Sequence, residues 1–208
     1  FSSFEKICDV EINIKLTRIN DAKVDPYGGI VFGTYNEDPD KINRKPIANL
    51  YRLAPDMSLT HLLSNITVSN GIAFSQNENI MYFADTPTGL IRKFEFTHNF
   101  KKLQELESNM MFNDVGEPDG ATVDINNNYW SARVRGKCII CINTKNGKII
   151  EKIELPTNTP TCVTFGDSDL SSLYVTSLRA DPVSDAAGGN LHKIKTETKG
   201  FKQLLTDI

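Results

Sequence analysis

Short apolar segments alternate with turn-forming residues along the whole chain, and no segment keeps apolar residues at a helical period. Four of these segments are apolar at most positions and end in a small or polar residue. They are GGIVFGT (28–34), NIMYFADT (79–86), NNYWSAR (127–133) and SSLYVTS (171–177). Runs of this kind, bounded by Gly, Asn and Ser, are typical of strands that are buried on both faces. The pattern therefore predicts an all-β chain.

The four segments recur at intervals of roughly 45 to 50 residues, so the chain contains an internal repeat. A short half-apolar strand precedes each segment, and two further strands follow it. The repeats span approximately residues 18–65, 68–108, 117–155 and 158–208. Four short strands per repeat, joined by turns, are the signature of a β-propeller with one four-stranded blade per repeat. We therefore expect residues 1–208 to form a single propeller domain of four blades.

Two segments at the ends of the repeats carry further expectations. Residues 1–17 resemble the remnant of a preceding blade, and GFKQLLTD (200–207) is expected to be the outermost strand of the last blade. The long segment at 176–190 separates two predicted strands and is expected to cover one mouth of the channel, since loops of that length are often functional.

The first strand of each blade lines the central channel of a propeller, so equivalent positions in these strands surround one axis. The aligned residues are Asn20, Asn70, Asp119 and Thr161. Glycine follows both Asn70 and Asp119, which leaves room for an oxygen atom to point inward. Converging carboxylate and carboxamide oxygens suit a hard divalent cation. Asn and Asp are also common in turns, which explains each residue taken singly; their shared register favours a metal site.

Composition and charge narrow the class of partner. The net charge of −3, without a run of like charges, excludes the usual footprint of a nucleic-acid-binding protein. The apolar runs are too short to span a membrane, and FSSFEKICDV (1–10) is not a signal peptide. The 4 cysteines lie in apolar, strand-like segments, so we expect buried, reduced thiols and a cytoplasmic protein. Cys138 and Cys141 are placed on opposite faces of one strand, which argues against a zinc site.

Longer motifs resemble the gluconolactonase, regucalcin (senescence marker protein) and luciferin-regenerating enzyme family. These motifs are RINDAKVDPYGGIVFGT (18–34), VSNGIAF (68–74), EPDGATVDINNNYW (117–130) and AGGNLHKIK (187–195). The resemblance runs in order from Arg18 towards the C-terminus. It implies a six-bladed propeller with one divalent metal ion in its channel, and enzymatic members that hydrolyse sugar lactones.

The resemblance also implies roles for individual residues. Asn70 corresponds to a metal ligand, and Asp119 corresponds to a metal ligand that is also the catalytic base. A third ligand, a glutamate of the first blade, would precede this chain. The residues implied to contact substrate are Arg18, Asn20 and either Glu37 or Asp38, between which the register does not decide.

Together these observations predict a metal-dependent sugar-lactone hydrolase in which Asp119 takes a proton from a metal-activated water. Ca²⁺ suits the oxygen ligands best, and Zn²⁺, Mg²⁺ and Mn²⁺ are also compatible with them. Two alternatives stay open: a non-catalytic metal-binding or interaction propeller, and an inactive fragment without the first-blade ligand. The sequence does not determine the oligomeric state.

Overall fold

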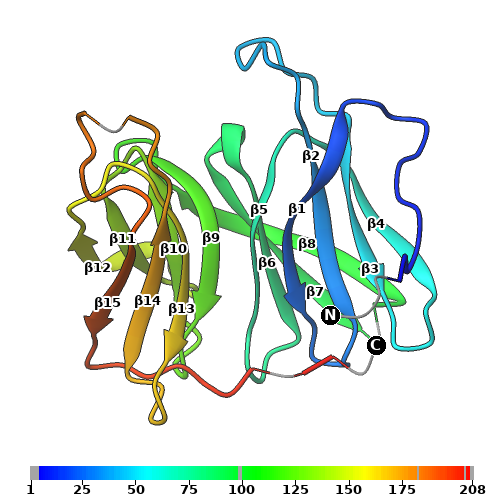
Figure 1. The fold of residues 1–208 in the computed structure, drawn as a ribbon. Coiled ribbons are helices and arrows are strands. Elements are labelled where there is room, and N and C mark those ends of the chain that lie inside the picture. Colours follow the sequence, from blue (N-terminus) through cyan, green and yellow to red (C-terminus); the bar gives the residue numbers. More distant parts are fainter. Residues whose placement is uncertain (1–4, 98–99, 182, 204, 207–208) are drawn as a thin grey trace.

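Four antiparallel sheets stand side by side in a propeller arrangement in the computed structural model, which describes residues 5–97, 100–181, 183–203 and 205–206 (Figure 1). The prediction of an all-β propeller chain is confirmed. Among the described residues the one helical element is the 3₁₀ turn η1 (Thr86–Thr88). In the same part of the chain, no helix has the length and hydrophobicity that crossing a membrane would require.

Strands follow one another in chain order within each sheet, and we number the sheets blade 1 to blade 4. Blade 1 contains β1 (Thr17–Val24), β2 (Ile30–Asn36), β3 (Ala48–Leu53) and β4 (Leu59–Ile66). Blade 2 contains β5 (Ser69–Phe74), β6 (Ile80–Asp85), β7 (Leu90–Thr97) and β8 (Lys102–Met111). Blade 3 contains β9 (Glu117–Val123), β10 (Tyr129–Val134), β11 (Cys138–Asn143) and β12 (Lys148–Glu154). Blade 4 contains β13 (Pro160–Gly166), β14 (Ser172–Ser177) and β15 (Leu191–Lys195).

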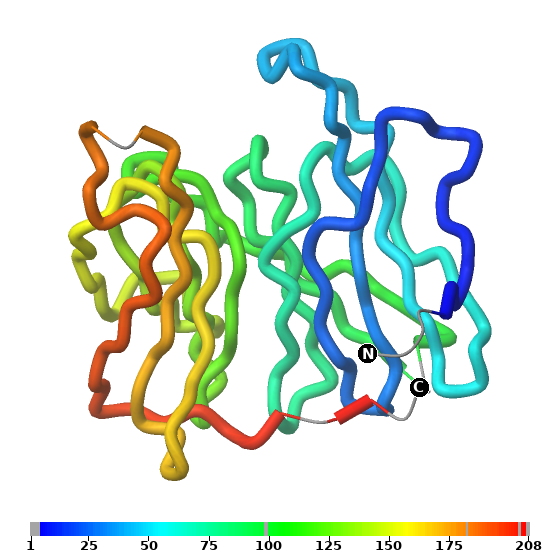
Figure 2. The backbone as a smooth tube through the Cα atoms, viewed as in Figure 1, coloured from blue at the N-terminus to red at the C-terminus, as the bar shows by residue number. Residues whose placement is uncertain are grey.

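The C-terminal segment differs from the prediction, because the described part of GFKQLLTD (residues 200–203, 205 and 206) forms no strand. The chain instead runs along the lower edge of the blades towards blade 1 (Figure 2). The Lys199 carbonyl accepts a hydrogen bond from the Ile125 amide at 2.9 Å, and the Thr206 hydroxyl donates to the Gly28 carbonyl at 2.9 Å. This tail therefore connects the last blade to blades 3 and 1. Residues 204 and 207 of the predicted strand lie outside the described residues.

Apolar cores fill the spaces between neighbouring blades, and each central strand serves two of them. On β6, Tyr82 packs with blade 3 residues, whereas its neighbour Phe83 packs with residues of blade 1. Because side chains alternate along a strand, a strand between two cores must be apolar at every position, which explains the continuous apolar runs. Cys138 and Cys141 of β11 likewise lie in different cores, as expected from their spacing. Trp130 belongs to the core between blades 3 and 4.

A polar residue directly follows the inner strand of each blade and closes the hairpin to the second strand. Asp25 accepts the Tyr27 amide at 2.7 Å through one carboxylate oxygen, and its other oxygen accepts Arg52 Nε at 2.6 Å. Asp124 accepts the Asn128 amide at 2.9 Å and Trp130 Nε1 at 3.0 Å. Such side chains satisfy the amides of the turn and fix the register of the strands that follow.

The segment before β1 forms turns and no strand in its described residues 5–16. Glu11 lies against blade 1, where its carboxylate accepts hydrogen bonds from the hydroxyls of Thr34 and Tyr51, both at 3.0 Å. The expectation that all four cysteines are buried is wrong for two of them. Cys8, in this segment, and Cys162, on the edge blade, are exposed free thiols.

Candidate metal and substrate site

A register irregularity interrupts each inner strand at the same place. The pairing of β1 with β2 jumps over Asn20 and Asp21, and the pairing of β9 with β10 jumps over Asp119 and Gly120. Corresponding shifts follow Asn70 on β5 and surround Thr161 on β13. A β-bulge breaks the strict alternation of side chains and re-aims the residues beside it. The four bulges therefore direct the aligned polar residues away from the interblade cores.

The aligned residues meet at one cavity, as their register predicts. A hollow of about 310 Å³ is lined by Asn20, Asp21, Asn70, Asp119, Gly120, Thr161 and Cys162. A larger cavity of about 570 Å³ shares Asn20, Asn70, Asp119 and Thr161 with it. Its further lining includes Arg18 and Tyr35 from blade 1, and Thr86 and Pro87 from η1. The inner strands thus bring polar groups from all four blades to one place.

A chain of hydrogen bonds fixes the orientation of Asn70 in this cavity. Asn20 Nδ2 donates to Asn70 Oδ1 at 3.0 Å, and Asn70 Nδ2 donates to Thr86 Oγ1 at 2.8 Å. The Thr86 hydroxyl in turn donates to the Pro118 carbonyl at 2.9 Å, next to Asp119. The Asn70 amide group therefore turns its oxygen to the Asn20 side and its nitrogen to Thr86. Sequence reasoning gave Thr86 no role, although this residue ends the repeat segment NIMYFADT (79–86).

Two partly buried carboxyl groups share the cavity. Burial, and then the negative charge of Asp21, raise the pKa of Asp119 to about 7. Burial also raises the pKa of Asp21, against the opposing effect of a hydrogen bond from the Ile72 amide at 3.0 Å. No basic side chain forms an ion pair with either carboxyl group within the described residues. The two carboxyl groups therefore lie close together without an ion-pair partner, although the charge of Lys23 partly offsets the raised pKa of Asp21.

Gly71 sets the distance between blades 2 and 3 beneath this site. Its φ of +62° is a left-handed conformation that favours glycine, and its carbonyl accepts the Tyr129 hydroxyl at 2.8 Å. A Cβ atom at this position would lie 2.3 Å from that hydroxyl oxygen. This close approach places β5, directly after Asn70, next to β9, which carries Asp119.

Arg18 lies at the rim of the larger cavity and contacts one of the two candidate acids. Its Nε donates to Glu37 Oε1 at 2.7 Å, and its guanidinium lies 4.4 Å from the centre of the Tyr35 ring. Asp38 is engaged differently, because its carboxylate accepts the Asp40 amide at 3.0 Å within the same loop. Glu37 is therefore the acid that the fold brings to Arg18.

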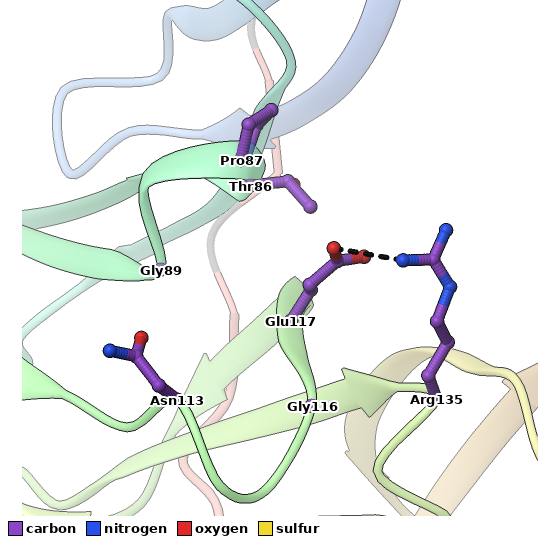
Figure 3. A pocket seen from close by; sticks show the side chains of 7 residues that line it. All are labelled: Thr86, Pro87, Gly89, Asn113, Gly116, Glu117 and Arg135. Carbon is purple, nitrogen blue, oxygen red and sulfur yellow. Dashed lines mark hydrogen bonds and ion pairs between the residues drawn. The ribbon is translucent and has the colours of Figure 1, made fainter. Parts of the chain in front are cut away.

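A side pocket of about 330 Å³ opens beside the larger cavity and shares Thr86, Pro87, Glu117 and Arg135 with it. Figure 3 shows the side chains of Glu117 and Arg135 pointing toward each other in the lining of this pocket, and their ion pair measures 3.0 Å. The loop between β14 and β15 contributes Leu178 to the larger cavity. Its Asp185 is buried and accepts the Thr157 hydroxyl at 3.0 Å.

The oxygen atoms of the site fit a hard divalent cation. Asn70 presents a carboxamide oxygen, and Asp119 presents a carboxylate whose raised pKa reflects burial near a second negative charge. A bound cation would relieve that repulsion. The described residues contain no group of three or more His, Cys, Asp and Glu side chains placed to hold a metal ion. The oxygen donors present are thus two carboxylates and the carboxamides beside them. Oxygen ligands of this kind suit Ca²⁺, Mg²⁺ or Mn²⁺, whereas thiolate and imidazole ligands suit softer metals.

Residues 2–179 match the family model described as the SMP-30/Gluconolactonase/LRE-like region. The chain belongs to this family. Among the curated members, regucalcin of Danio rerio is 33% identical over 80% of this chain and 57% of its own length. The pentonolactonase XacC of Haloferax volcanii is 30% identical over 92% of this chain and 67% of its own length.

Solved structures of the family agree with the fold. A luciferin-regenerating enzyme superposes with a TM-score of 0.91 at 29% identity and covers 100% of this chain and 71% of its own. This chain therefore corresponds to part of the length of each of these SMP-30/gluconolactonase family members.

Proposed function

We propose that this protein hydrolyses a sugar lactone, with Asn70 and Asp119 holding a divalent cation and Asp119 serving as general base. The observation that carries the proposal is the meeting of Asn20, Asn70 and Asp119, from three successive blades, at one cavity. Relatives named for lactone hydrolysis support it, including the pentonolactonase XacC. A cation bound there would supply a Lewis acid for the lactone carbonyl.

Asp119 is suited to moving a proton near neutral pH. Burial and the charge of Asp21 raise the pKa of Asp119 to about 7 in the metal-free protein, and a bound cation would lower it, so Asp119 would be ionised at neutral pH and able to act as a base. We infer that the ionised carboxylate accepts a proton from the water that attacks the lactone carbonyl. As the ring opens, the protonated carboxyl can return that proton to the alkoxide that leaves.

The remaining residues position the substrate. Arg18 offers guanidinium donors to hydroxyl groups or the ring oxygen of a sugar. Asn20 offers its carboxamide oxygen to a hydroxyl group, because its Nδ2 already donates to the Ser69 carbonyl at 2.8 Å and to Asn70 Oδ1 at 3.0 Å. We assign the acidic substrate contact to Glu37 and not to Asp38, because Glu37 bonds to Arg18 whereas Asp38 bonds within its own loop. Contacts of this kind hold a flexible polyol in one orientation, so that its lactone carbonyl lies where water can attack it.

Lactone opening measured by base consumption at constant pH, with gluconolactone as the probe and a divalent metal present, tests the proposal. Asp119→Asn keeps the size of the side chain but removes the base, and we expect it to lower kcat by at least about 10²-fold. Asp56→Asn is the matched control, because Asp56 is an exposed turn residue that bonds to Ser58. Wild-type rates in Asp119→Asn would refute the proposal, whereas metal binding without hydrolysis in the wild type would favour a non-catalytic metal-binding propeller.

A further inference from the structure

The rim of the larger cavity carries more positive charge than its carboxylates neutralise. Four basic side chains line the cavity, namely Arg18, Lys41, Arg44 and Arg135. Arg18 forms an ion pair with Glu37 at 2.7 Å, and Arg135 forms one with Glu117 at 3.0 Å. Neither Lys41 nor Arg44 forms an ion pair with a carboxylate among the described residues. The rim therefore has two cations without a charge partner, both on the loop between β2 and β3.

Arg44 is held in place although it has no carboxylate partner. Its Nε and Nη2 donate to the Asp38 carbonyl at 3.0 and 2.7 Å, and its guanidinium lies 5.6 Å from the centre of the Tyr35 ring. Its third nitrogen, Nη1, has no hydrogen-bond partner in the part of the chain that the structure describes. A guanidinium fixed in this way loses little conformational freedom when it binds a further group.

The loop that carries these two cations has internal support. The Asp40 carboxylate accepts the amides of Ile42 and Asn43, both at 3.2 Å, and also the Asn43 side chain at 2.9 Å. In Figure 1 the loop rises above blade 1 at the end where the inner strands begin. Lys41 and Arg44 are thus presented at the mouth, on the side of Tyr35 and Arg18.

We propose that the physiological substrate is an anionic lactone, whose sulfonate or phosphate substituent binds Arg44 and Lys41 at the rim. This inference rests on the proposed lactone hydrolysis and names its substrate class. Asp119 is partly buried in the same cavity, at the hollow it shares with Asn70, whereas Lys41 is exposed, so a lactone carbonyl placed at Asp119 leaves the far end of the sugar free to reach Lys41 and Arg44. Guanidinium groups bind such tetrahedral anions through paired, charge-assisted hydrogen bonds.

The experiment compares gluconolactone with its 6-phosphate and with the 6-sulfonate analogue, each corrected for spontaneous opening, in the complete protein with divalent metal. We expect kcat/KM to be about tenfold or more higher for the anionic lactones, mainly through a lower KM, and the advantage to shrink at 0.5 M salt because charge attraction is screened. In Arg44→Gln we expect the ratio of anionic to neutral kcat/KM to fall about tenfold. The two anionic arms distinguish a phosphate from a sulfonate substrate.

Arg92→Gln is the matched control, because Arg92 pairs with Glu105 at 2.7 Å on the outer strands β7 and β8, away from the cavity lining. That variant should keep the wild-type ratio. Hydrolysis of gluconolactone without a preference for the anionic lactones, or an equal loss for all three in Arg44→Gln, overturns this inference and leaves lactone hydrolysis intact. Failure to open any lactone overturns the proposed function together with it. As a readout independent of turnover, 6-phosphogluconate should bind more tightly than gluconate, and Arg44→Gln should remove the difference.

Discussion

Metal binding by this site is expected to release a proton, in an amount that follows from the environment of Asp119. Burial and the charge of Asp21 raise the pKa of Asp119 to about 7, and a metal ligand must be deprotonated to bind. At pH 6 a carboxyl group with that pKa is about 90% protonated, and at pH 8 it is about 10% protonated. We therefore expect Asp119 to release about 0.9 proton per cation at pH 6 and about 0.1 at pH 8. Below pH 7 the affinity should fall by up to about tenfold per pH unit.

Calorimetric titration of Ca²⁺ or Mn²⁺ into the metal-free protein measures this release, when it is repeated at each pH in two buffers that differ in heat of ionisation. In Asp119→Asn the ligand charge is lost, so we expect much weaker binding, and any proton still released belongs to Asp21, whose pKa is also raised. The exposed-residue variant Asp56→Asn should behave as the wild type. Tight binding at pH 6 with no proton released would refute the reasoning, because it would mean that Asp119 is already ionised or is not a ligand.

Three further outcomes concern the framework of the site. Arg52→Gln leaves the buried Asp25 without the guanidinium that bonds to it at 2.6 Å. The free energy of unfolding, measured by thermal unfolding, should therefore fall by about 3–5 kcal/mol, and a fall of less than about 1 kcal/mol would contradict this. Gly71→Ala, at φ +62° and facing the Tyr129 hydroxyl, should destabilise the protein by more than the roughly 1 kcal/mol expected for Tyr129→Phe, as denaturant titration would measure. Finally, the folded pKa of Asp119 lies above its unfolded value of 3.8. The metal-free protein should therefore become less stable as the pH rises from about 4 through 7, and urea midpoints that rise across this window would contradict it.

The repeat pattern predicts the architecture and the centre of the site because both depend on register. Continuous apolar runs predict the central strands, whose side chains pack into the cores on both sides of a blade. One polar residue at the same register of each inner strand predicts the position of the channel. Asn20, Asn70, Asp119 and Thr161 were aligned from spacing alone, and they line one cavity in the structure. A propeller repeats the same geometry in every blade, so equivalence in sequence becomes proximity in space.

Features that depend on contacts between repeats could not be predicted in this way. Thr86 reaches Asn70 and Pro118 only because η1 follows β6 at the mouth. The choice between Glu37 and Asp38 follows from the path of one loop, in which Asp38 bonds to the Asp40 amide. The tail after β15 has an alternating pattern that suits a strand, yet Phe201 packs against the core between blades 2 and 3. Local pattern alone does not encode such tertiary contacts.

The measurement that tests the central claim most directly is lactone opening during stepwise return of metal to chelator-treated protein. If Asn70 and Asp119 hold one catalytic cation, activity should be lost on chelation and recover in proportion to added metal, reaching a plateau at about one ion per chain. In Asp119→Asn the same titration should restore no activity. Full hydrolysis in the presence of chelator, or equal recovery in that variant, would contradict the account.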